Sequence, residues 1–133
     1  MMRPFMTLAL IVAPMAAPVA ARSPGDIAEV REGLIAVAVG DMIQKNCGAI
    51  SPRLVRVYTL RTQLIAAARE AGFTNAEIDA FVDNATVRAE LEGVARQYLE
   101  ERGVEPAEPK SYCDVGNLEI AQQTDVGRLL RNR

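Results

Sequence analysis

The apolar residues of this chain recur at helical spacing, and no stretch alternates between apolar and polar residues as a strand would. Proline, glycine and capping residues divide the chain after residue 22 into separate helical segments. The sequence therefore predicts an all-α fold without strands. The expected helices cover residues 26–47, 52–71, 75–83, Asn84 to about 102, and from between Asp114 and Asn117 to about Leu130.

The clearest local signal is the start of the short third helix. Thr74 and Glu77 have the spacing of a capping box, in which each side chain accepts a hydrogen bond from the other residue's backbone amide. Phe73 before the cap and Ile78 after it form the matching hydrophobic staple. A helix that begins directly after Thr74 is therefore expected.

The second helix is predicted from its start signal and from its apolar face. Gly48 offers a left-handed position after the first helix, and Ser51-Pro52 is a cap followed by a proline suited to the first helical position. Leu54 and Tyr58 are predicted to face the core. In the next helix, Val82 is expected to be buried together with its neighbour Phe81.

Residues 1–21 have the pattern of a secretory signal peptide. Arg3 supplies the positive start, Phe5–Val19 is a short apolar run, and small residues precede the expected cleavage after Ala21. A membrane anchor or a buried helix are the alternatives, but two prolines interrupt the run and disfavour a spanning helix. We therefore expect a single helical domain over residues 22–133, located in a periplasm or secreted.

The charge of the chain is mildly acidic. The net charge is −2, and loss of Arg3 with the leader makes it one unit more negative. Such a domain does not resemble a nucleic-acid-binding protein. Arg128, Arg131 and Arg133 follow the last acidic residue, and either complement the dipole of the last helix or form a surface for an anion, a headgroup or a protein.

The two cysteines, Cys47 and Cys113, flank the middle of the chain. Cys47 ends the first helix and Cys113 precedes the last, so an up-down arrangement of four long helices brings both to one end of the bundle. In an oxidising compartment such a pair indicates a disulfide. An intermolecular disulfide, a redox pair and two buried thiols are the alternatives, although C-x-x-C spacing is absent. We predict a four- to five-helix up-down bundle with one structural disulfide.

The sequence contains no recognisable catalytic or metal-binding constellation. It has no histidine, which removes the commonest general base and metal ligand, and no glycine-rich phosphate loop. Asp79 and Asp83 share a helical face but lack the ligand pattern of a calcium loop. Asn84-Ala85-Thr86 matches a glycosylation sequon, and we interpret Asn84 as a helix cap. We therefore predict no catalytic residue, no cofactor and no metal.

A longer pattern surrounds the second cysteine. Gly116 is expected to let the backbone turn sharply beside the disulfide, and Glu119 to lie in the first turn of the last helix. The pattern comprises Tyr112-Cys113, Val115-Gly116, Glu119-Ile120, Thr124, Gly127 and Leu129-Leu130-Arg131.

With the earlier cysteine, the G-F-T-x-x-E-I segment and the leader, this pattern resembles a family of small exported bacterial proteins catalogued only as a domain of unknown function (DUF5333). The resemblance covers most of residues 26–131. It implies export and a shared architecture, and it transfers no activity and no catalytic residue.

These observations favour a non-enzymatic interaction or accessory protein of the periplasm with an unknown protein partner. Nothing favours a nucleic-acid partner, and no stable membrane span is expected after cleavage of the leader. One alternative is a periplasmic acid-stress chaperone, similar to the small helical acid-response proteins that carry one disulfide. The resemblance offers a second alternative, an accessory factor of a membrane respiratory complex, because members of the family can lie near genes for such complexes. A small hydrolase with paired Asp/Glu residues is the third.

Overall fold

The computed structural model describes residues 13–14 and 23–133, so the predicted signal peptide lies outside the described residues except for residues 13 and 14. In this part of the chain the structure is mostly helical, with five α-helices and a single two-stranded sheet. None of the described helices is long and apolar enough to cross a membrane. The elements in chain order are η1 (Pro24–Asp26), α1 (Ala28–Asn46), β1 (Ile50–Pro52), α2 (Leu54–Glu70), α3 (Asn75–Asp83), α4 (Ala85–Glu101), α5 (Pro109–Gln122), η2 (Gly127–Leu129) and β2 (Leu130–Asn132).

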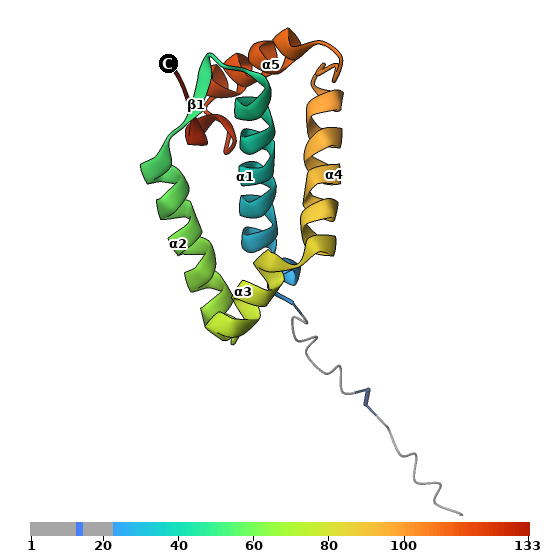
Figure 1. The fold of residues 1–133 in the computed structure, drawn as a ribbon. Coiled ribbons are helices and arrows are strands. Elements are labelled where there is room, and N and C mark those ends of the chain that lie inside the picture. The colour runs from blue at the N-terminus through green and yellow to red at the C-terminus, as the bar shows by residue number, and fades with distance from the viewer. Residues whose placement is uncertain (1–12, 15–22) are drawn as a thin grey trace, which may run out of the picture.

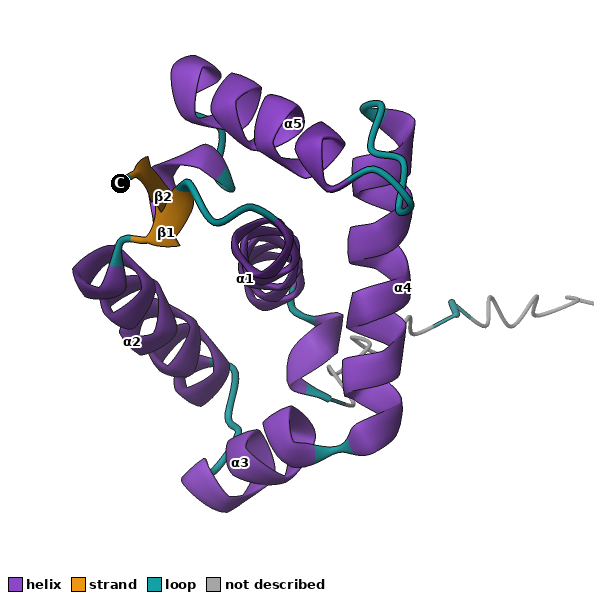
Figure 2. Ribbon diagram, turned by 45° about the horizontal axis from the view of Figure 1, so that its top comes forward, coloured by secondary structure: helices purple, strands orange, loops and turns teal. Residues whose placement is uncertain are grey.

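Helix α1 lies at the centre of the fold. Helices α2 and α4 flank it, and α3 crosses beneath it to connect them (Figure 1). Helices α1, α2 and α4 alternate in direction as expected, whereas α5 lies across the far end of α1. Figure 2 shows that α2, α3, α4 and α5 together surround α1.

The core is built mainly on α1, because its apolar residues recur on more than one face of the helix. Val39 and Ile43 are completely buried in a main cluster at the end of α1 near α5. Val30 belongs to a second, smaller cluster, where it packs with Ala68 of α2 and Ile78 of α3. The two clusters fix both ends of α1 against the surrounding helices.

The predicted capping box at the start of α3 is confirmed. The Glu77 amide donates to Thr74 Oγ1 at 3.2 Å, and the Thr74 amide donates to Glu77 Oε2 at 2.8 Å. Asn84 caps α4 as predicted, since its Oδ1 accepts from the amides of Thr86 and Val87. Local side-chain chemistry therefore sets both helix starts.

Helix ends agree with prediction at two of three glycines. Gly72 after α2 and Gly103 after α4 have positive φ angles of 100° and 101°. Gly48 is not among the described glycines with positive φ, because the chain leaves α1 through Cys47 in an extended conformation. The left-handed turn predicted at Gly48 is wrong.

The expectation of a chain without strands is also wrong. Ser51-Pro52, interpreted above as a helix start, belongs to β1, which pairs antiparallel with β2 at the C-terminus. The register places Ile50 opposite Asn132 and Pro52 opposite Leu130. Proline is tolerated here because each strand of a two-stranded sheet is an edge strand.

The last helix lies earlier in the chain than predicted. Helix α5 begins at Pro109, in the first helical position, and ends at Gln122 because Gln123 adopts a left-handed conformation with φ 50°. Gly116 is therefore inside the helix and does not form a turn. A Cβ at Gly116 would lie 2.6 Å from Ile50 Cδ1 and 2.7 Å from Ile43 Cγ2. The missing side chain lets α5 pack closely on α1 and β1.

Candidate functional site

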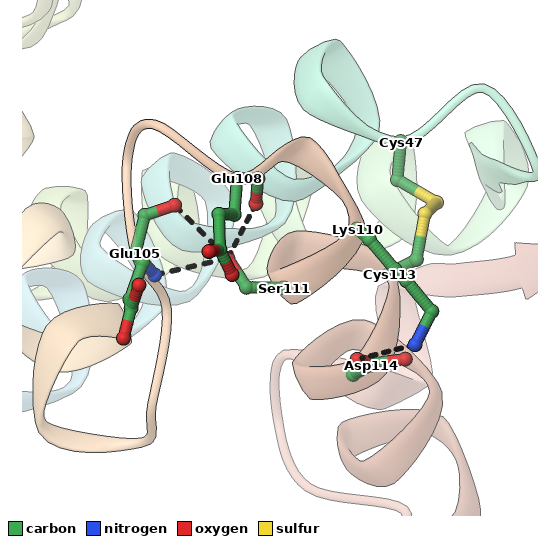
Figure 3. Close-up of polar contacts among 7 residues, drawn as sticks. All are labelled: Cys47, Glu105, Glu108, Lys110, Ser111, Cys113 and Asp114. Atoms are coloured by element: carbon green, nitrogen blue, oxygen red, sulfur yellow. Dashed lines mark hydrogen bonds and ion pairs between the residues drawn. A yellow bond between two sulfur atoms is a disulfide. The ribbon is translucent and has the colours of Figure 1, made fainter.

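Cys47 and Cys113 form the predicted disulfide, with an Sγ–Sγ distance of 2.04 Å and a Cα–Cα distance of 5.3 Å. The start of α5 is held by Ser111, whose single hydroxyl proton is shared between the carbonyl oxygens of Glu105 and Glu108, which lie 3.1 and 2.7 Å from Oγ (Figure 3). The Glu105 amide donates back to Ser111 Oγ at 2.9 Å. These bonds order the turn before α5 and so position Cys113 beside the end of α1. The disulfide has a structural role in this arrangement.

A concave apolar surface lies on one side of α1. We call it the apolar groove and define it by Leu34, Val37 and Met42 of α1, Phe81 and Val82 of α3, and Val87 and Leu91 of α4. Its main chamber has a volume of about 510 Å³. A second chamber of about 430 Å³ between α1, α2 and α3 shares Leu34, Val37, Phe81 and Val82 with the first. The two chambers are therefore adjacent along these four residues.

The apolar groove continues toward the sheet. A third chamber of about 210 Å³ shares Val37 and is also lined by Leu54 and Leu130. Leu54 and Tyr58, predicted to face the core, are 73% and 68% exposed, and Val82, predicted to be buried, is 46% exposed. The apolar face that the sequence assigned to the core is thus partly uncovered in the described residues.

Two pairs of oppositely charged side chains lie at the margin of the apolar groove. Lys45 Nζ lies 2.6 Å from Asp41 Oδ2, and this hydrogen bond raises the pKa of Lys45. Arg88 Nη2 lies 3.3 Å from Asp83 Oδ1, and Arg88 Nε donates to the carbonyl oxygen of Val82. Because these pairs neutralise one another locally, the groove suits an apolar ligand surface more than a charged one.

The opposite side of α1 carries a different, acidic cleft. It has a volume of about 410 Å³ and is lined by Glu29 and Glu32 of α1 together with Asp125 and Arg128. Arg128 Nη1 lies 3.7 Å from Asp125 Oδ1. Among the described residues, no group of three or more His, Cys, Asp or Glu side chains could hold a metal ion, and Asp79 and Asp83 belong to no such group.

The C-terminal arginines do not lie at the end of α5, the last α-helix, because α5 ends at Gln122. The helix-dipole interpretation of these residues is therefore wrong. Arg128 lies in η2, and Arg131 Nε donates to Ser51 Oγ across the sheet at 3.4 Å. The Arg133 amide donates to the carbonyl oxygen of Ala49. Their use as an interaction surface stays a prediction.

Glu119 is the buried carboxylate that the sequence reasoning misplaced. It lies in the last turns of α5, and its side chain is 5% exposed. Tyr98 Oη donates to its Oε1 at 2.9 Å, and Arg102 Nε lies 3.2 Å from the same oxygen. Thr124 Oγ1 donates to Oε2. Pro109, which suits the first helical position, could have placed the start of α5, and hence Glu119, correctly.

Tyr98 and Arg102 also contact each other. The Arg102 guanidinium lies 3.3 Å from the centre of the Tyr98 ring, and Nη1 donates to the Tyr98 carbonyl oxygen at 3.0 Å. Burial raises the pKa of the Tyr98 hydroxyl, and the hydrogen bond to Glu119 raises it further. Every buried side-chain nitrogen and oxygen in the described residues has a hydrogen-bond partner. The cluster is a satisfied network that joins α4 to α5.

Residues 24–131 match the family described as "Family of unknown function (DUF5333)", in agreement with the resemblance noted from the sequence. No curated protein and no solved structure matches the chain significantly.

Proposed function

The chain belongs to this family of unknown function, so the family supplies no activity. From the geometry of the chain we propose that it is a non-enzymatic, exported binding protein. In this proposal the apolar groove receives an amphipathic helix of a partner protein. The observation that carries the proposal is the groove itself, an apolar surface between α1, α3 and α4 that no described part of the chain covers. Apolar grooves between helices are a common docking site for an amphipathic helix of a partner.

The dimensions of the groove favour a helix as its occupant. On α1 the groove extends from Leu34 to Lys45, which at about 1.5 Å per residue corresponds to roughly 17 Å, or three helical turns. Helices α2 and α4 stand on either side of this stretch (Figure 1). A helix laid along α1 between them would complete a four-helix arrangement and bury its apolar face on both walls.

The chemistry of the groove favours an apolar stripe on that helix. The floor is formed by Leu34, Val37 and Met42, and methionine adapts easily to different partner side chains. The marginal pairs Asp41–Lys45 and Asp83–Arg88 leave little net charge to attract an acidic or basic segment. The partner we propose is therefore an amphipathic segment with apolar residues at helical spacing.

Two features support a location outside the cytoplasm. The leader at residues 1–21 has the composition of a signal peptide. The Cys47–Cys113 disulfide is compatible with an oxidising compartment. Both are part of the proposal, and a mature N-terminus determined on protein from the native host would test them directly.

The binding proposal is tested by site-specific photo-crosslinking in the native host. At the test position a photoreactive residue replaces Val82, which lines the main and the second chamber. At the control position it replaces Val55, which is 81% exposed and lines none of the three chambers. We expect position 82, and not position 55, to capture a partner peptide with apolar residues at helical spacing. The synthetic peptide should then bind the mature protein, and Val82→Glu should weaken its affinity at least tenfold while Val55→Glu leaves it unchanged.

Three outcomes would contradict the proposal: equal capture at both positions, capture only of a second copy of the chain, or unchanged peptide affinity in Val82→Glu. Circular dichroism of the two variants separates loss of binding from loss of fold, because both substitutions place a glutamate on an exposed helical surface.

A further inference from the structure

The face of α2 opposite to its buried residue Leu64 is exposed to solvent. Four exposed residues recur on this face at helical spacing: Val55, Thr59, Thr62 and Ala66. None of them carries a charge, and Val55 is 81% exposed. An uncharged strip therefore runs along the outer side of α2.

The two threonines of this strip do not depend on water for their hydrogen bonds. Thr59 Oγ1 donates to the Val55 carbonyl oxygen at 2.9 Å, and Thr62 Oγ1 donates to the Tyr58 carbonyl oxygen at 3.1 Å. Because each hydroxyl is bonded within the helix, the strip loses few hydrogen bonds when it leaves water. Tyr58 lies beside the strip and is 68% exposed, and its ring and hydroxyl suit a boundary between apolar and aqueous surroundings.

Arginines gather beside this face, although the chain as a whole has a net charge of −2. Residues 50–69 contain four arginines and residues 126–133 contain three more, and all 17 acidic residues lie outside these two stretches. The antiparallel pairing of β1 with β2 brings the two stretches together beside the first turns of α2 (Figures 1 and 2). The seven exposed arginines are Arg53, Arg56, Arg61, Arg69, Arg128, Arg131 and Arg133.

Most of these arginines are available for an anionic ligand. One is paired with Asp125, and the other six form no ion pair with any described residue. Two are held by neutral acceptors: Arg53 Nε donates to the Leu130 carbonyl oxygen at 2.9 Å, and Arg131 Nε donates to Ser51 Oγ at 3.4 Å. These bonds position the guanidiniums and leave their Nη donors for a phosphate group, which arginine binds through parallel N–H donors.

We propose that the outer face of α2 and the adjacent arginines form a docking surface, the α2 surface, for a membrane that contains anionic lipids. The arginines contact the lipid phosphates, and Val55 and Tyr58 enter the boundary between headgroups and acyl chains. Neither residue lines any of the chambers and clefts described above, so this face offers no pocket for the side chains of a soluble partner. A lipid surface needs no such pocket, because its headgroups and chains adapt to the protein.

Membrane docking by the α2 surface is independent of the helix binding proposed above. Val82 lines the apolar groove, whereas Val55 does not. Since no described helix is long and apolar enough to span a membrane, the attachment is peripheral. Substitutions at the two positions therefore separate the two activities.

Cosedimentation of the disulfide-bonded mature protein with lipid vesicles tests the docking. Phosphatidylcholine vesicles with about one-third phosphatidylglycerol should bind the protein, pure phosphatidylcholine should not, and added NaCl should weaken binding by screening the charges. The double variant Arg56→Glu/Arg133→Glu should lower the partition coefficient about tenfold or more. The matched control Arg96→Glu/Lys110→Glu makes the same change in net charge on exposed residues of α4 and α5, and it should bind as the wild type does.

A tryptophan reporter identifies the face that meets the lipid. The chain contains no tryptophan, so one introduced residue supplies all of the tryptophan fluorescence. With anionic vesicles, the emission of Val55→Trp should shift to shorter wavelength and should be quenched by lipids with brominated acyl chains. The emission of Val82→Trp, in the apolar groove, should show neither change.

Membrane docking is refuted if anionic vesicles do not bind the protein, which is the result expected when the α2 surface receives an acidic protein. Equal loss of binding in the two charge variants, or equal quenching at positions 55 and 82, also refutes it. Self-association without vesicles that disappears in Arg56→Glu/Arg133→Glu, measured by sedimentation equilibrium, would assign the surface to a second copy of the chain. If that variant does not fold, the tryptophan pair decides alone.

Discussion

Replacing Gly127 by alanine should be strongly destabilising, although its φ angle lies outside the left-handed region. A Cβ at this position would overlap the Glu119 carbonyl group and would lie 2.7 Å from the Ile120 amide nitrogen. These are backbone atoms of α5 and cannot rotate away, so η2 must move. That movement disturbs the hydrogen bonds of Thr124 with Gly127 and Glu119. Overpacking and the weakened bonds together should cost about 2–5 kcal/mol.

Gly93 provides the matched control. It lies within α4, and a Cβ there would meet no atom within 4 Å. Gly93→Ala should therefore stabilise the protein by about 1 kcal/mol through helix propensity. Urea unfolding followed by far-ultraviolet circular dichroism measures both variants. A Gly127→Ala variant as stable as the wild type, or shifted in the same direction as Gly93→Ala, would refute the close approach of η2 to α5.

Two further predictions concern the disulfide and the buried tyrosine. Replacing Cys47 and Cys113 together by alanine should lower the free energy of unfolding by about 4 kcal/mol, because the disulfide joins residues 66 apart and restricts the unfolded chain. A reductant should lower the stability of the wild type by a similar amount and leave that of the variant unchanged. Because the pKa of Tyr98 is raised in the fold, its contribution to stability is complete below about pH 10 and is lost as the pH rises toward the folded-state pKa. Between neutral and alkaline pH, the free energy of unfolding from urea titrations should therefore fall less in the Tyr98→Phe variant than in Tyr58→Phe. Identical falls in the two variants would contradict the raised pKa of Tyr98.

Features that depend on a few neighbouring residues were predictable from the sequence. The capping box of Thr74 and Glu77, the Asn84 cap and the glycines after α2 and α4 each satisfy hydrogen bonds within about one helical turn. The disulfide was also predictable, since the ends of α1 and α5 meet at the same end of the fold. The caps need no knowledge of the rest of the chain, whereas the disulfide also required the up-down order of the helices.

The sheet was not predictable by the same reasoning. Strand β1 has three residues, too few to show alternation, and its partner β2 lies about eighty residues later. Ser51-Pro52 is chemically suited to a helix start. The strand forms because it pairs with β2, and a hydrogen bond from the Arg53 amide to the Leu129 carbonyl oxygen continues this contact beyond the two strands. A distant partner therefore overrides the local preference.

The apolar groove was missed for a different reason. Helical periodicity identified apolar faces at Leu54, Tyr58 and Val82 but could not show whether another element covers them. In the described fold α2 and α4 stand apart on either side of α1, so part of each face stays open (Figure 2). Leu54 and Val82, which were assigned to the core, thus line chambers of the candidate binding surface, whereas Tyr58 is exposed outside them.

The antiparallel pairing of Ile50 with Asn132 has a consequence for the order in which the protein can fold. A chain made from its N-terminus exposes α1, α2 and α4 long before β2 exists. Contacts between residues so distant in sequence form slowly, because a large loop must close first. Final closure over Ile43 and Ile50 must therefore wait for the last few residues. A chain that lacks the three residues of β2 would leave the end of the core around Ile43 and Ile50 permanently uncovered.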